Sequence, residues 1–193
     1  MIPLGILAAA GGAVAAAGSY DLLATEILTG TQATVTFSSL GTYAADYQHL
    51  QVRMVARSNR GDTDSYLYVQ FNGDTASNYN HHYLRGTGSS VGSDVTSASY
   101  PSGILDINFL PAATAPSNSF GVATLDILDP FETSKYTTAR TLSGQAGSGY
   151  SRIGLSSGAW RNTASLTSIT FDDIFGSFVS GSRFSLYGLK AGA

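Results

Sequence analysis

The sequence predicts an all-β protein: an antiparallel β-sandwich of jelly-roll-like type, with an extended or partly helical N-terminal arm. Three observations support this class. Apolar and polar residues alternate over several short runs, which is the period of a half-buried strand. Glycine accounts for 22 of the 193 residues and charged residues for only 12%, a composition that favours strands and tight turns. Long stretches rich in Glu, Lys and Leu are absent from the sequence, so we expect no helix longer than one or two turns.

The first 18 residues, MIPLGILAAAGGAVAAAG, are apolar and carry no charged side chain. They lack the positively charged start of a signal peptide. They are also too rich in Ala and Gly for a membrane span, which takes roughly 20 strongly apolar residues. We therefore expect an arm over residues 1–18 that packs on a neighbouring subunit, followed by a β-sandwich domain over residues 19–193. The anchoring side chains of this arm are Ile2, Leu4, Ile6 and Leu7.

The segment from Gln48 to Phe71 carries the clearest strand signal. Two runs there, 50–56 and 66–71, alternate apolar and polar residues. The polar connector SNRGDTDS between them is made of turn-forming and charged residues, which predicts one long hairpin. Asn72 and Gly73 tolerate positive φ, so the second strand should end at that point.

The other expected strands are bounded by Gly, Pro, Asn, Asp or Ser. Residues 20–29 and 33–37 should form a second hairpin, and residues 40–47 a loop or a single helical turn. Further strands are expected at 79–85, 104–110, 120–128, 136–143, 151–157, 166–171 and 183–189, about ten in all. The Gly/Ser-rich stretch 86–103 should be a surface loop. Strands at this spacing without intervening helices indicate a sandwich.

The charge and cysteine content excludes several kinds of partner. The formal net charge is −3, and Lys and Arg are scattered singly, so we expect no nucleic acid partner. The chain has no cysteine, which rules out disulfides and thiolate metal sites. We also expect no membrane partner and no cofactor.

The sequence contains motifs of catalytic type, but none has its required context. The pattern G-x-S-x-G occurs at 88–92 and at 154–158. It acts in an α/β-hydrolase only when a His follows later in the chain, and no His follows His82. His49 has no second ligand at a sequence spacing typical of metal sites. The adjacent His81 and His82 would point to opposite faces of a strand and could not bind one metal ion together. We therefore expect no catalytic residue and no metal site.

Acidic loops and scattered carboxylates leave two weaker alternatives open. Asp62-Thr63-Asp64, and Asn72-Gly73-Asp74 with Asn78, offer oxygen ligands but lack the spacing of a calcium loop, so turn formation is expected. A pair of catalytic carboxylates for glycoside hydrolysis would have to come from Asp106, Asp126, Asp129, Glu132, Asp172 or Asp173. Their separation in space would identify such a pair.

Aromatic residues suggest a further alternative. Tyr66, Tyr68 and Trp160, the only tryptophan, could form a sugar-stacking platform if they were exposed on one sheet. Packing in an interface or in the core is the favoured interpretation.

Six stretches, taken in order, carry a resemblance to a known family. They are IPLGILAAAGG (2–12), YQHLQVRMVARSNR (47–60), VQFNGDTASNY (69–79), FGVATLDILD (120–129), GAWRNTASLTSITF (158–171) and SRFSLYGLKA (182–191). Together they resemble the small β-sandwich structural proteins of tailed bacteriophage virions. The resemblance implies a virion component and assigns no catalytic residue.

On this resemblance we expect a capsid decoration or cement protein, a homotrimer that binds the major capsid or tail proteins and bridges neighbouring subunits. The alternative is a receptor-binding or carbohydrate-binding module of a tail or fibre, with a glycan of the host surface as its partner.

Overall fold

The computed structural model of the protein describes residues 20–100, 103–147 and 151–190. Within these ranges the chain forms twelve β-strands and one short 3-10 helix, η1. In chain order the elements are β1 (Tyr20–Ile27), β2 (Thr34–Phe37), η1 (Leu40–Tyr43), β3 (His49–Ala56), β4 (Asp64–Phe71), β5 (Tyr79–Gly86), β6 (Val91–Tyr100), β7 (Ile104–Pro111), β8 (Gly121–Leu128), β9 (Thr137–Gln145), β10 (Arg152–Trp160), β11 (Ile169–Asp173) and β12 (Arg183–Leu189). The arm predicted for residues 1–18, with Ile2, Leu4, Ile6 and Leu7, lies outside the described residues.

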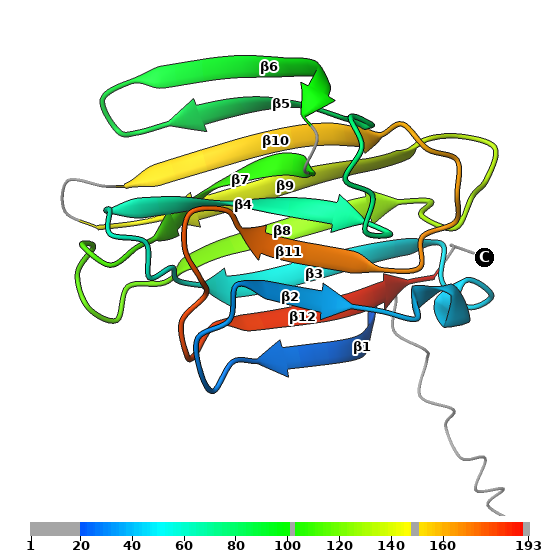
Figure 1. The fold of residues 1–193 in the computed structure, drawn as a ribbon, viewed down its shortest axis with the longest axis horizontal. Coiled ribbons are helices and arrows are strands. Elements are labelled where there is room, and N and C mark those ends of the chain that lie inside the picture. Colours follow the sequence, from blue (N-terminus) through cyan, green and yellow to red (C-terminus); the bar gives the residue numbers. More distant parts are fainter. Residues whose placement is uncertain (1–19, 101–102, 148–150, 191–193) are drawn as a thin grey trace, which may run out of the picture.

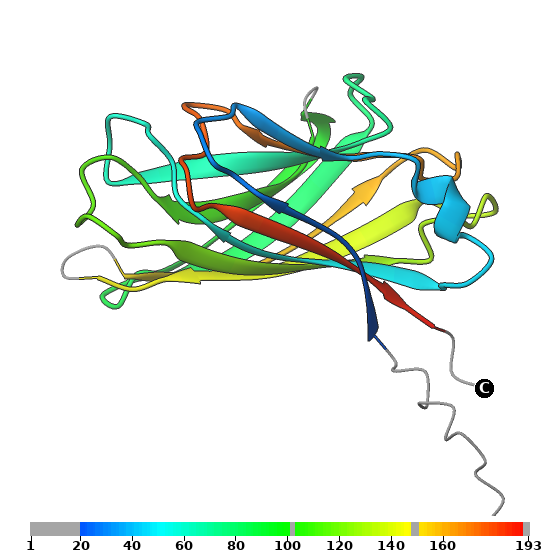
Figure 2. The same cartoon turned by 90° about the horizontal axis from the view of Figure 1, so that it is seen from below.

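The strands form two antiparallel sheets that pack face to face (Figure 1). One sheet has eight strands in the order β1-β12-β3-β8-β9-β10-β5-β6, and the other has four in the order β2-β11-β4-β7. Figure 2 shows the two layers from the side. The predicted class, an antiparallel β-sandwich, is confirmed.

The strand order also explains why the two sheets differ in width. The arrangements β1-β12-β3-β8 and β2-β11-β4-β7 together make the eight strands of a jelly roll, with its two sheets of four. The hairpins β5–β6 and β9–β10 are insertions between these strands. They lie side by side and extend the first sheet beyond β8. We call these four strands the extension.

The main core lies between the two halves of the jelly roll. Its alternating residues face inward as the sequence predicts: Leu50, Val52, Met54 and Ala56 of β3, and Leu67, Val69 and Phe71 of β4, are all buried. Aromatic rings complete the packing, with Phe184 of β12 tilted against Phe171 of β11 at 5.3 Å between ring centroids.

Two predicted hairpins are wrong. β3 belongs to the eight-stranded sheet and β4 to the four-stranded sheet, so the segment 48–71 crosses between the layers. The same holds for β1 and β2, expected as a hairpin over 20–37. Alternation shows which face of a strand is buried, but two strands that face each other across a core have the same pattern as two strands that pair. The connector after β3 is held by Arg57, whose guanidinium donates to the carbonyls of Pro116 and Ala115 at 2.8 and 3.0 Å.

The surface loop predicted for 86–103 is also wrong, because residues 91–100 form β6 at the edge of the larger sheet. Ladder pairing with β5, such as Gly86 with Val91 and Leu84 with Ser93, overrides the low strand propensity of the Gly/Ser-rich sequence. The predicted end of the strand before Asn72 is confirmed, since Asn72 and Gly73 have φ of 53° and 64°.

Candidate functional site

The residues that carry nucleophilic motifs lie in settings unlike that of a catalytic serine. Ser90 lies in the turn between β5 and β6, where its hydroxyl is 2.8 Å from that of Thr87. Ser156 lies within β10 and its side chain is buried. Neither serine opens a helix, which the nucleophile elbow requires.

The three histidines occupy different places in the larger sheet. His49 Nδ1 accepts the backbone N–H of Asp129 at 3.0 Å. His81 points inward on β5 and is buried, whereas His82 points outward and is exposed. Within the described ranges no group of three or more His, Asp or Glu side chains could hold a metal ion.

The candidate carboxylates are spread over both sheets. Asp126 lies on the outer face of β8, where it accepts hydrogen bonds from Gln51 at 2.7 Å and Arg140 at 3.0 Å. Asp173 of β11 is buried and accepts from the Ser65 hydroxyl at 2.6 Å. Burial, and then the neighbouring charge of Asp173, raise the pKa of Asp172.

Asp129 and Glu132, in contrast, lie close together, because the Glu132 backbone N–H donates to the Asp129 carbonyl oxygen at 3.2 Å. Asp129 and Glu132 follow β8, and Asp106 lies in β7.

The aromatic platform suggested by Tyr66, Tyr68 and Trp160 is not formed. Trp160 is only 1% exposed and packs edge-on against Phe71, with ring centroids 6.0 Å apart. Tyr68 is buried as well, and the half-buried Tyr66 lies against the Phe175 ring at 5.9 Å. The three side chains therefore form no exposed platform on one sheet, and Trp160 belongs to the core.

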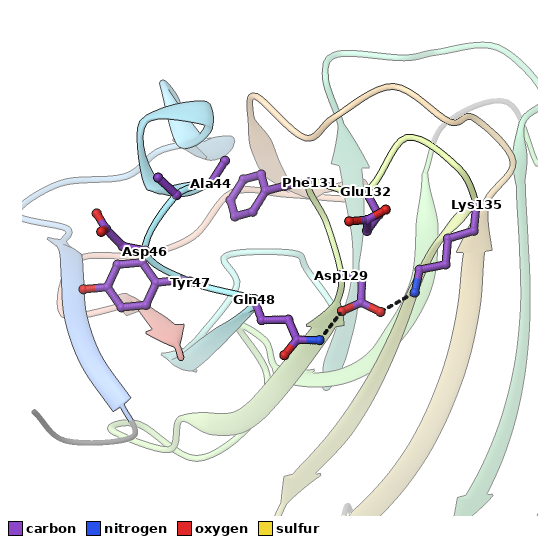
Figure 3. A pocket seen from close by; sticks show the side chains of 9 residues that line it. Ala44, Asp46, Tyr47, Gln48, Asp129, Phe131, Glu132 and Lys135 are labelled. Atoms are coloured by element: carbon purple, nitrogen blue, oxygen red, sulfur yellow. Dashed lines mark hydrogen bonds and ion pairs between the residues drawn. The ribbon is translucent and has the colours of Figure 1, made fainter. Parts of the chain in front are cut away.

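A concave pocket of about 520 Å³ lies at one end of the sandwich, between the connection from η1 to β3 and the connection from β8 to β9 (Figure 3). Its lining comprises Ala44, Ala45, Asp46, Tyr47, Gln48, Asp129, Phe131, Glu132 and Lys135. We call it the end pocket. The Tyr47 ring, which is part of the lining, packs closely on the backbone of Gly188, where a Cβ would lie 2.4 Å from the ring.

The charges of the end pocket are largely satisfied within the chain. Asp129 pairs with Lys135 and accepts a hydrogen bond from Gln48 Nε2 at 3.2 Å. The hydrogen bond from Lys135 is the main reason that the pKa of Asp129 is lowered. Asp46 and Glu132 also belong to the lining, so the pocket could receive hydroxyl groups of a small polar ligand.

The second candidate site is the outer face of the larger sheet over β8 and the extension. Six apolar side chains there are between 49% and 78% exposed: Leu84, Val91, Val122, Leu142, Ile153 and Leu155. We call this set the apolar outer face. Residues paired in register project to the same side of a sheet, and Leu142, Leu155 and Leu84 are consecutive partners across β9, β10 and β5. The neighbouring row runs from Val122 through Ile153 to Val91.

The polarity of the extension is inverted in this region. On the inner side of β9 and β10, behind the exposed leucines, the buried residues include Thr141, Ser143 and Ser156. The outer side carries Leu142, Ile153 and Leu155 instead. Strands normally place their apolar residues inward, so the outer side of the extension has the composition of a surface that another molecule covers.

Two glycines lie in the floor of a groove in the apolar outer face, and the Ile153 side chain packs over Gly86, where a Cβ would lie 3.4 Å from Ile153 Cγ2. Gly144 lies between Val122 and Ile153, and Gly86 lies between Ile153 and Val91. Two separate hollows of about 590 and 270 Å³ adjoin here, with Leu142 and Ile153 in both linings. A Cβ at Gly144 would be 3.6 Å from its nearest neighbour, the Arg152 carbonyl oxygen, so the space above is open.

These observations define the class: a jelly-roll β-sandwich with an inserted four-stranded extension, an apolar outer face and a polar end pocket. Comparison of the chain with models of protein families and with curated proteins finds no match. No helix in the described part of the chain is long and apolar enough to cross a membrane. Sequence reasoning named Asp129 and Glu132 of the end pocket among its candidate carboxylates but missed the apolar outer face.

Proposed function

We propose that the protein is a non-enzymatic structural protein of a bacteriophage virion, a capsid decoration or cement protein that bridges neighbouring subunits. The apolar outer face supports this proposal most strongly. A protein that works alone in water gains nothing from placing Leu142, Ile153 and Leu155 outside while burying Thr141 and Ser156. The resemblance of the sequence to small virion β-sandwich proteins agrees with this use.

The size of the effect suits a contact repeated over a particle. Covering one half-exposed Val, Leu or Ile side chain contributes roughly 1 kcal/mol, so the six side chains contribute about 6 kcal/mol before the cost of association. One such contact is weak. In a homotrimer that binds several major capsid or tail proteins, the contacts are multivalent and together hold the protein on the particle.

Particle incorporation tests this function. The double variant Leu142→Asn with Leu155→Asn should fold normally and bind particles at least tenfold less, measured by co-sedimentation of the purified protein with phage particles that lack it. Thr138→Asn with Ser157→Asn is the matched control, because these exposed residues lie on the same two strands outside the apolar outer face. Equal incorporation of both double variants would contradict the role of the face.

The end pocket favours a second candidate function, binding of a host-surface glycan at a tail or fibre. Gln48, Asp46 and Glu132 provide hydrogen-bonding groups, and Phe131 provides an apolar ring for a sugar face. A glycan array probed with the protein and with Phe131→Ala tests this candidate. Binding that Phe131→Ala removes would support it. Signals identical for both proteins, or no signal from either, would count against it.

A further inference from the structure

We propose that the groove of the apolar outer face receives residues 2–7 of a second copy of this chain. This inference rests on the proposed function, because it names the contact by which copies of a particle component join. The groove runs across β8, β9, β10, β5 and β6, with Leu142, Leu155 and Leu84 along one side and Gly144 and Gly86 in its floor.

The chemistry of the groove selects an uncharged occupant. Two arginines lie at its margin and both are engaged within the chain. Arg152 pairs with the buried Asp64 at 2.6 Å, and Arg85 lies over the Tyr83 ring at 5.9 Å. Any charged group of an occupant would lose water without gaining a partner from the six apolar side chains. Residues 2–7, IPLGIL, carry four large apolar side chains and no charge.

The length of this segment matches the groove. Crossing from β8 to β6 covers four interstrand spacings, or about 19 Å at roughly 4.8 Å each. Six extended residues at about 3.3 Å each span roughly 20 Å. In an extended chain Ile2, Leu4 and Ile6 project to one side, and this side would face the groove.

The position of β1 favours the segment of a second copy over that of the same chain. β1 lies at the opposite edge of the eight-stranded sheet from β5 and β6. Between β1 and the groove, the outer face carries Arg53, whose guanidinium lies 5.5 Å from the Tyr20 ring and 4.9 Å from the Tyr187 ring. Arg183 lies exposed on β12 in the same region. A segment reaching its own groove would have to cover these charged groups, whereas a neighbour reaches the exposed groove directly.

Disulfide trapping tests the proposal cleanly because the chain has no cysteine of its own. Full-length protein with Leu4→Cys and an affinity tag is mixed with untagged full-length Leu155→Cys and oxidised. We expect a tagged and untagged cross-linked dimer in at least tenfold excess over the same mixture with Leu22→Cys as partner. Leu22 is the matched control, since it is an exposed leucine of the same sheet on β1.

Several results would overturn the proposal. They are equal cross-linking to both positions, no cross-link at Leu155→Cys, or a bond that forms only when Leu4→Cys and Leu155→Cys share one chain. A second variant, Gly144→Val, fills the groove floor and should reduce cross-linking to Leu155→Cys at least fivefold while the protein stays folded. Protein that binds particles without this cross-link would refute the inference alone. A cross-link in protein that never binds particles would refute the proposed function alone.

Discussion

The substitution Asp74→Ala should destabilise the fold by removing a set of hydrogen bonds around the only tryptophan. Asp74 lies just after β4, and its Oδ2 accepts from Trp160 Nε1 at 2.7 Å and from Asn78 Nδ2 at 2.8 Å. Its Oδ1 accepts the Ala76 backbone N–H at 2.9 Å. These bonds tie the turn after β4 to the end of β10, so their loss should loosen the contact between the two sheets.

The magnitude follows from burial. The Trp160 side chain is almost fully buried, and leaving its N–H without an acceptor costs about 1–3 kcal/mol. The bonds from Asn78 and Ala76 are more exposed and contribute about 0.5–1 kcal/mol each, because water replaces them. We therefore expect Asp74→Ala to lower the free energy of unfolding by about 2–5 kcal/mol.

Urea denaturation followed by the fluorescence of Trp160 measures this change directly, because the reporter is the residue that loses its partner. Glu26→Ala, an exposed acidic position on β1, is the control and should shift stability by less than about 0.5 kcal/mol. A loss below about 0.5 kcal/mol for Asp74→Ala, or a loss equal to that of Glu26→Ala, would refute the reasoning.

The carboxylate of Asp74 should also make stability depend on pH. Burial alone would raise its pKa, but the hydrogen bonds from Asn78, Trp160 and Ala76 outweigh burial and lower the pKa below the ordinary value of 3.8. A lowered folded-state pKa stabilises the protein above 3.8, and this contribution is lost as the pH falls through the folded pKa. Asp74→Asn should show a smaller loss of stability on acidification than the unchanged protein.

Two further substitutions test the packing and the buried histidine. Gly188→Ala should lower the free energy of unfolding by about 1–3 kcal/mol, because its Cβ would clash with the Tyr47 ring. Gly144→Ala, which has open space for a Cβ, should lower it by less than about 1 kcal/mol. Equal shifts in melting temperature for the two variants would contradict this. His81 has a pKa lowered from 6.5 by burial, against the opposing charge of Asp94, so the folded state binds protons less readily and stability should fall as the pH drops below 6.5. His81→Gln should flatten that part of the stability curve, and an unchanged slope would show that His81 does not cause it.

The sequence predicted the strands better than their partners. The alternation from Leu50 to Ala56 correctly identified the buried face of β3, because apolar and polar side chains alternate along a strand that has one buried and one solvent-exposed face. It could not show that β3 and β4 lie in different sheets, since pairing and facing strands carry the same pattern. For β6, propensity pointed to a loop, and only the ladder with β5 made it a strand.

The sites were harder to predict than the fold, for a physical reason. Alternation alone assigns Ile153 and Leu155 to the core, because apolar residues normally face inward. The structure places them outside and buries Ser156, a reversal that only the packing of the extension determines. Trp160 lies in the core, one of the two uses that the sequence favoured, and its N–H donates to Asp74.

A cryo-electron microscopy map of the particle that carries this protein tests the central claim most directly. We predict twelve-stranded sandwiches in which a neighbouring chain covers Leu142, Leu155 and Leu84 on the outside of the eight-stranded sheet. A map in which those three side chains face open solvent in every copy would contradict the account.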